Sequence, residues 1–134
     1  MDNAFEFHGE CTVFLKKGDH RRDLLAKSNF IRPEDVYRYE ELCDGMKLAT
    51  RTNFNPLAVA SAYLDGRWQG SLPDLTEPAH SELFRPQIIS GAKFPADYGK
   101  VRFDCDKRCE SCSYCREVQK NATVTPAREA AFLE

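Results

Sequence analysis

The sequence predicts a small single domain of the α/β or α+β class, on the evidence of three observations. At 134 residues the chain has the length of one ordinary domain and can bury most of its apolar surface. Its first half holds two helical patterns, each with a proline at the start and a glycine at the end, separated by a short apolar stretch. Further along, four cysteines fall within eleven consecutive positions. We therefore expect a helix–strand–helix core followed by a C-terminal cysteine-ligated metal loop.

The patterns divide residues 1–134 into four consecutive segments of one domain. These are an N-terminal segment (1–30), a helix–strand–helix unit (31–70), an irregular proline-rich covering segment (71–100), and the cysteine cluster with terminal helices (101–134).

Residues that are typical of helix starts and helix ends predict the helix–strand–helix unit. Pro33 suits the first turn of a helix that Gly45 ends, and residues 46–50 then form a short apolar stretch that predicts a buried strand. Asn55 is a suitable N-cap for a second helix, which Gly66 ends. The stripe of this helix that we expect to face the core comprises Leu57, Ala60, Tyr63 and Leu64.

Four prolines between residues 70 and 98 exclude long helices there and leave one turn, over residues 80–84. An irregular segment of this length is usually functional or mobile, so we predict that it docks onto a larger protein. Its apolar side chains would contact that partner or would instead cover the domain's own core: Leu75, Leu83, Phe84, Ile88, Ile89 and Phe94. Two terminal helices are expected, over residues 116–121 and, capped by Thr125, over residues 126–133.

Charge and hydropathy exclude several classes of partner. The 19 Lys and Arg residues against 21 Asp and Glu give a formal charge of −2, so no global basic field attracts DNA or an anionic membrane. No apolar run approaches the roughly 20 residues that span a bilayer, and the acidic start is unlike a secretory signal, so we expect a soluble cytoplasmic protein. A short basic cluster could bind RNA, although such clusters are more often solvated surface: Lys16, Lys17, Arg21 and Arg22, with Phe14 and His20.

Six cysteines without an export signal favour metal binding or redox chemistry over disulfides. Four of them form the pattern C-x3-C-x2-C-x2-C in residues 104–115, DCDKRCESCSYC. A structural zinc ion is usually held by two short knuckles separated by a long excursion, whereas a continuous C-x2-C-x2-C loop can wrap an iron–sulfur cubane. The spacing therefore favours a 4Fe–4S cluster over zinc, with these metal ligands: Cys105, Cys109, Cys112 and Cys115.

The other two cysteines stand apart. Cys11 and Cys43 remain rivals of Cys105 for the fourth ligand, because ligands meet in space and not in sequence. Otherwise Cys43 is expected to be a small buried hydrophobe. Cys11, three residues after His8, belongs either to half of a second metal site or to a mobile N-terminal segment. The sequence has no phosphate-binding glycine loop, G-x-S-x-G elbow or H-E-x-x-H helix, so no hydrolase chemistry is predicted.

Part of the chain resembles the late barrel units of the collagenase-like peptidase family. The resembling stretches are residues 31–40 (IRPEDVYRYE), residues 46–51 (MKLATR), and Asn55-Pro56 with residues 62–75 (AYLDGRWQGSLPDL). The resemblance implies a fragment of a (β/α) barrel, with Cys11 matching an upstream ligand-bearing segment. It also implies a relation to iron–sulfur-dependent, oxygen-independent hydroxylation of quinone precursors and RNA. A complete barrel takes about 250 residues, so this chain would supply only its last units.

Together these observations predict an iron–sulfur cluster-binding accessory domain or subunit of a larger redox or radical-type enzyme. The cluster would transfer electrons or support the structure, and we expect no turnover by the chain alone. The alternative is a zinc-stabilised binding module that contacts protein or RNA.

Overall fold

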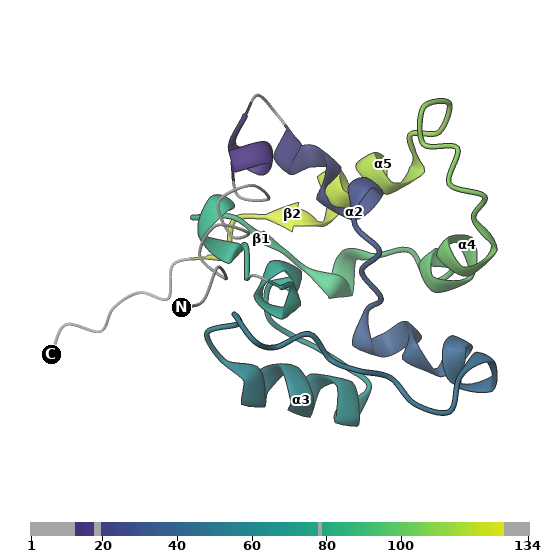
Figure 1. The fold of residues 1–134 in the computed structure, drawn as a ribbon. Coiled ribbons are helices and arrows are strands. Elements are labelled where there is room, and N and C mark those ends of the chain that lie inside the picture. The colour runs from purple at the N-terminus through teal and green to yellow at the C-terminus, as the bar shows by residue number, and fades with distance from the viewer. Residues whose placement is uncertain (1–12, 18–19, 78, 128–134) are drawn as a thin grey trace, which may run out of the picture.

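The computed structural model describes residues 13–17, 20–77 and 79–127 of the chain. Figure 1 shows a chain made mostly of short helices, with the two short strands β1 and β2 side by side. The elements in chain order are η1 (His20–Asp23), α2 (Leu24–Lys27), η2 (Pro33–Leu42), α3 (Pro56–Asp65), η3 (Leu72–Leu75), η4 (Ser81–Leu83), β1 (Ile88–Ile89), η5 (Gly91–Lys93), α4 (Tyr98–Asp104), α5 (Tyr114–Ala122) and β2 (Thr123–Val124).

A two-stranded antiparallel sheet joins the middle of the chain to its end. Strand β1 pairs with β2, which continues directly from α5, in the register Ile88 to Val124 and Ile89 to Thr123. Ile89 is fully buried, and a bridge between Ser71 and Ser90 extends the pairing. The mixed, helix-rich domain confirms the predicted fold class, although its strands are not where the sequence predicted one.

Helix α3 begins and ends where its caps predict. The side chain of Asn55 accepts a hydrogen bond from the backbone N–H of Ala58 (3.1 Å), Pro56 occupies the first turn, and Gly66 ends the helix at φ 65°. The predicted core-facing stripe is wrong for Leu57 and Leu64, which are exposed, whereas Tyr63 packs against the buried Val59 and Ala62. The helix therefore presents part of its apolar surface to solvent.

The other parts of the predicted helix–strand–helix unit differ from expectation. The first helix lies in place but is a 3-10 helix, and it ends at Leu42. The strand predicted over residues 46–50 is wrong, since this segment forms no ladder with any described residue and is largely exposed. Cys43, predicted to be buried, is exposed because the chain leaves η2 in an extended conformation at this residue. A strand needs a neighbouring strand for its hydrogen bonds, which local sequence does not provide.

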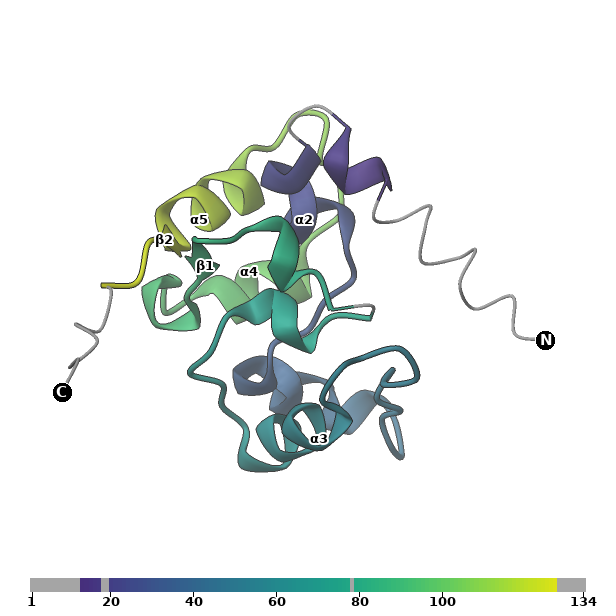
Figure 2. The same ribbon diagram turned by 90° about the vertical axis from the view of Figure 1, so that its left-hand side faces the viewer.

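Phe30 lies at the centre of the molecule and packs against three clusters of buried side chains. One cluster is built around Leu72 and Ile89, a second around Leu25 and Tyr98, and the third around Val59. Figures 1 and 2 show the corresponding arrangement: α3 and η2 form one end of the molecule, and α2, α5 and the small sheet lie at the other. One aromatic side chain thus connects both ends.

The proline-rich segment supplies much of this core. Leu75, Phe84 and Ile89 are buried, and Leu83 and Phe94 pack against the buried cluster around Ile89. The prediction that these side chains form a docking surface is therefore wrong, and the alternative, that they cover the domain's own core, is confirmed. The single turn expected over residues 80–84 is present as η4.

The C-terminal part contains the expected helix after the cysteines. It is α5, and it extends slightly beyond both predicted ends. The helix predicted over residues 126–133 lies mostly outside the described residues. Within the part of the chain that the structure covers, no helix has the length and apolar character needed to cross a membrane.

Candidate metal centre

The four clustered cysteines lie on the connection between α4 and α5. Cys105 directly follows α4, Cys109 and Cys112 lie in the loop, and Cys115 is in the first turn of α5. All four thiols are free, and three are partly buried while Cys112 is exposed. The loop therefore starts and ends on helices that fix Cys105 and Cys115.

Local backbone bonds shape the loop. Lys107 adopts the left-handed conformation (φ 60°), and its backbone N–H donates to the Sγ of Cys105 at 3.2 Å. A turn follows, in which the N–H of Ser111 donates to the carbonyl of Arg108 (3.2 Å) and the N–H of Cys112 donates to the carbonyl of Cys109 (3.4 Å). An N–H directed at a cysteine sulfur stabilises its thiolate form, which is the form that binds metals.

Arg102 on α4 connects this loop to α2. Its Nη1 donates to the Sγ of Cys115 at 3.3 Å, and its Nη2 donates to the carbonyl oxygen of Ser28 at 3.0 Å. The thiol of Cys109 makes a second, longer contact with the same region, donating to the carbonyl of Ala26 at 3.8 Å. The cysteine loop is thus held against the end of α2 at two points.

Burial and a neighbouring cation have opposite effects on the pKa of the Cys115 thiol. Burial raises the pKa of the Cys115 thiol, the charge and hydrogen bond of Arg102 lower it, and the thiols of Cys105 and Cys109 raise it again. The net direction is upward. Without a bound metal, the Cys115 thiol is therefore held in its protonated form more strongly than an ordinary cysteine.

The donor chemistry fits a thiolate-bound centre, but the sulfurs do not form a ready ligand set. Among the described residues, no group of three or more His, Cys, Asp or Glu side chains is arranged so that it could hold a metal ion. Occupation by a cluster would therefore require the loop to draw its thiols together, Cys112 above all.

The two isolated cysteines are separate from this loop. Cys11 lies outside the described residues. Cys43 is exposed, its thiol donates to the carbonyl of Tyr39 at 3.4 Å, and it lines a different cavity from Cys105. The assignment of Cys105, Cys109, Cys112 and Cys115 as ligands stays a prediction.

Sequence reasoning missed a buried ion pair next to the loop. Arg32 and Asp35 form a salt bridge at 2.6 Å, and the Arg32 guanidinium lies over the rings of Phe94 (4.7 Å) and Tyr98 (4.8 Å). A cavity of about 350 Å³ lies beside this pair and is also lined by Cys105. Sequence reasoning also missed Arg102, whose position one helical turn before Cys105 was a signal that could have identified it.

The basic cluster gives little evidence of a nucleic-acid site. The Arg21 side chain donates to the carbonyl of Leu83 at 2.8 Å, and Phe14 stacks on His20 with ring centroids 4.4 Å apart. Lys16 and Lys17 are exposed. Part of the cluster is thus engaged within the domain, and RNA binding stays a prediction.

The chain is similar to an uncharacterized protease of Methanocaldococcus jannaschii. The two are 34% identical over an alignment 110 residues long, which covers 76% of this chain and 31% of that protein. The chain therefore spans less than a third of the length of this curated relative. No protein-family model matches the chain, and no solved structure matches it. The similarity to a protease agrees with the peptidase part of the resemblance to collagenase-like peptidases and does not bear on its iron–sulfur part.

Proposed function

We propose that this chain is an iron–sulfur cluster-binding accessory domain or subunit of a larger redox or radical-type enzyme. The carrying observation is that the four cysteines of the C-x3-C-x2-C-x2-C run lie on one connection between α4 and α5, where Arg102 donates a hydrogen bond to the Sγ of Cys115. The proposed ligands are Cys105, Cys109, Cys112 and Cys115. A 4Fe–4S cluster bound there would accept and donate single electrons.

The surroundings of the sulfurs suit such a role. The Arg102 guanidinium places a positive charge at Cys115, and the Lys107 backbone N–H donates to Cys105. Hydrogen bonds and positive charge at ligand sulfurs stabilise the more negative, reduced state of a cluster and raise its reduction potential. The chain would thus supply the thiolates that bind the cluster, and its hydrogen bonds and charges would raise the reduction potential of that cluster.

The comparison with a longer relative is the reason for proposing that this chain works with a larger protein. This chain spans 31% of the protease of Methanocaldococcus jannaschii, so a related protein carries most of its mass outside the region shared with this chain. The relation to iron–sulfur-dependent hydroxylases, which the resemblance to collagenase-like peptidases implies, belongs to the same proposal. We infer that the active site of the larger enzyme is completed by that additional protein.

Anaerobic purification of the full chain tests the proposal. A brown protein with broad visible absorption, and with iron and acid-labile sulfide in about equal amounts, is expected. A colourless protein containing one zinc ion would refute the cluster and favour the zinc-stabilised binding module. The variant Cys43→Ala is the matched control, because Cys43 is an exposed thiol outside the loop and its loss should leave the iron content unchanged.

A further inference from the structure

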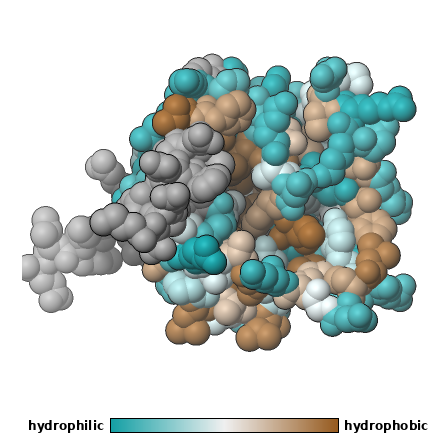
Figure 3. Space-filling model, in the orientation of Figure 1, coloured by the Kyte–Doolittle hydropathy of each residue, from teal (hydrophilic) through white to brown (hydrophobic). Residues whose placement is uncertain are grey.

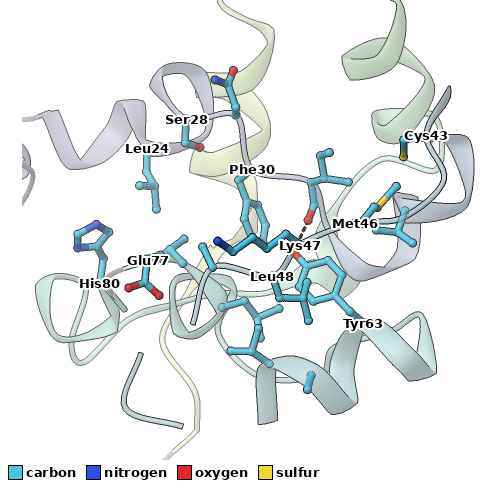
Figure 4. A pocket seen from close by; sticks show the side chains of 18 of the residues that line it. Leu24, Ser28, Phe30, Cys43, Met46, Lys47, Leu48, Tyr63, Glu77 and His80 are labelled. Carbon is cyan, nitrogen blue, oxygen red and sulfur yellow. Dashed lines mark hydrogen bonds between the residues drawn. The ribbon is translucent and has the colours of Figure 1, made fainter. Parts of the chain in front are cut away.

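A large open cavity of about 1480 Å³ is lined by α3, the end of η2 and the residues that follow it, together with the segment from α2 to Ile31, and by none of the four clustered cysteines. Figure 4 shows Phe30 and Leu48 directed into this cavity, with Tyr63 on the α3 side. Glu77 and His80 lie toward one end, and Cys43 and Met46 toward the other. The proposed function makes no use of this cavity.

One wall of the cavity is an extended backbone. Residues 44–49 line it and are outside any helix or strand. No backbone hydrogen bond joins them to any other residue that the structure describes. An extended backbone whose N–H and C=O groups are unpaired is a site at which another strand can add.

Exposed apolar side chains are frequent in the same part of the chain, and two of them, Met46 and Leu64, line the cavity. Of the nine large exposed hydrophobic residues in the described chain, five fall between positions 42 and 64: Leu42 (69% exposed), Met46 (40%), Phe54 (85%), Leu57 (75%) and Leu64 (87%). Figure 3 shows hydrophobic surface in the central hollow of this face and along its lower edge, over α3. A concentration of this kind marks an interaction surface, because single exposed hydrophobic residues are normally scattered.

The charges in the cavity indicate what kind of partner fits. Its charged lining residues carry both signs, since Lys27 and Lys47 are opposed by Glu40, Asp44 and Glu77. A site for nucleic acid or for an anionic membrane would need a basic surface. An apolar cavity with mixed charges and a free backbone edge instead suits a polypeptide strand.

We propose that residues 44–49, the cavity and the exposed face of α3 form a docking groove for an extended strand of a larger protein. The strand pairs with the backbone of residues 44–49 and places apolar side chains, at alternate positions, into the cavity. This rests on the larger partner of the proposed function, and on the finding that a related protein has most of its length outside the region matched here. The groove thus specifies where that partner binds, and that it binds through an extended strand with apolar side chains.

Site-specific photo-crosslinking in the native host tests the groove. The photoreactive residue benzoylphenylalanine replaces Met46 or Leu57 in the full chain, and Lys100 on α4 is the exposed control position. We expect adducts from both groove positions to one other polypeptide, with the Met46 adduct in a segment that has apolar residues at alternate positions, and no adduct from position 100. Leu57→Glu should reduce the adduct from position 46 at least about tenfold, and because Leu57 is exposed the variant should still fold.

Hydrogen exchange supplies a second readout. The backbone N–H groups of residues 44–49 should exchange at the rate of an open segment in the free chain and at least about tenfold more slowly in the crosslinked complex. Adducts to a second copy of this chain, adducts to residues 1–12 of the same chain, or no adduct at either groove position would overturn the inference. Iron content, measured on the same samples, separates the two proposals. If the samples contain iron but no strand partner is crosslinked, only the docking groove is refuted. If the strand partner is crosslinked but the samples contain no iron, only the cluster is refuted.

Discussion

Arg102 donates from Nη1 to the Sγ of Cys115 across 3.3 Å. The same guanidinium is fastened through Nη2 to the carbonyl of Ser28, so its position relative to the sulfur is fixed by the fold and not by the loop alone. Arg102 is also the main influence that lowers the pKa of a thiol whose burial raises it.

We therefore predict that, in the metal-free protein, Arg102→Gln raises the pKa of the Cys115 thiol above its value in the wild type. The thiolate is the reactive form, so alkylation of Cys115 near neutral pH should slow about tenfold for each unit of increase in that pKa. Site-resolved mass spectrometry after timed treatment with iodoacetamide measures this rate. Arg108→Gln is the control. The Arg108 side chain is exposed, and among the described contacts it pairs only with the carboxylate of Asp106. An unchanged rate in Arg102→Gln would show that the hydrogen bond has no influence on the thiol.

The ligand assignment predicts which cysteines the cluster needs. Replacing Cys109, Cys112 or Cys115 singly by Ala should abolish iron retention, because each removes one of the thiolates that the run presents, and Cys105→Ala should do the same. Iron analysis and visible absorption of the anaerobically purified variants measure the effect. Any of these variants that keeps its full iron content and spectrum is not missing a ligand.

The single variants Cys43→Ala and Cys11→Ala should each keep their full iron content. Should either isolated cysteine prove necessary while Cys105→Ala keeps its iron, the fourth ligand lies outside the run. This outcome is the one that the exposed position of Cys43, on a different cavity from Cys105, argues against.

Local sequence predicted some elements well for a physical reason. Helix α3 was predicted from Asn55, Pro56 and Gly66, because a cap hydrogen bond and a left-handed end are made by residues within a few positions of each other. Its orientation was not predicted, since which face of a helix is buried depends on what packs against it. For α3 this is Phe30 and Trp68, which lie outside the helix.

The failures concern interactions between distant parts of the chain. The segment at residues 46–50 has the composition of a strand, yet pairing depends on a neighbour that no described residue supplies. The sequence places the four cysteines close together along the chain, but Arg102 contacts Cys115 from another helix, and the Arg32 and Asp35 pair lies more than sixty positions from the loop. Such contacts are set by tertiary packing, and a single sequence carries little trace of them.

A buried glycine on α4 provides a test of packing near the ion pair. A Cβ added at Gly99 would overlap the carboxylate of Asp35, which is held by its salt bridge to Arg32. Alanine normally stabilises a helix relative to glycine, but here we predict that Gly99→Ala destabilises the domain by about 1–3 kcal/mol. Gly45→Ala is the control, because nothing lies within 4 Å of a Cβ at that position, and it should change the free energy of unfolding by no more than about 0.5 kcal/mol. Urea unfolding measures both, and equal effects of the two substitutions would contradict the packing argument.

The phenol of Tyr63 predicts a dependence of stability on alkaline pH. Its hydroxyl donates to the carbonyl of Ile31 at 2.5 Å, and burial, followed by the charge of Glu34, raises the pKa of Tyr63 to about 12. In the unfolded chain a tyrosine has a pKa of about 10, so above that pH the unfolded state loses this proton more readily than the folded state. The contribution of Tyr63 to stability is therefore complete below about pH 10 and is lost as the pH rises toward 12.

Tyr63→Phe removes both the hydrogen bond and this titration. At neutral pH we predict a loss of about 1 kcal/mol in the free energy of unfolding, because the carbonyl of Ile31 loses its donor. Between about pH 10 and 12 the variant should lose less stability than the wild type, so the difference between the two proteins shrinks as the pH rises. Tyr37→Phe, at an exposed position, is the control and should follow the wild type at every pH. Urea unfolding across this range measures the difference, and parallel curves for the wild type and Tyr63→Phe would mean that the Tyr63 hydroxyl ionises as freely in the folded protein as in the unfolded chain.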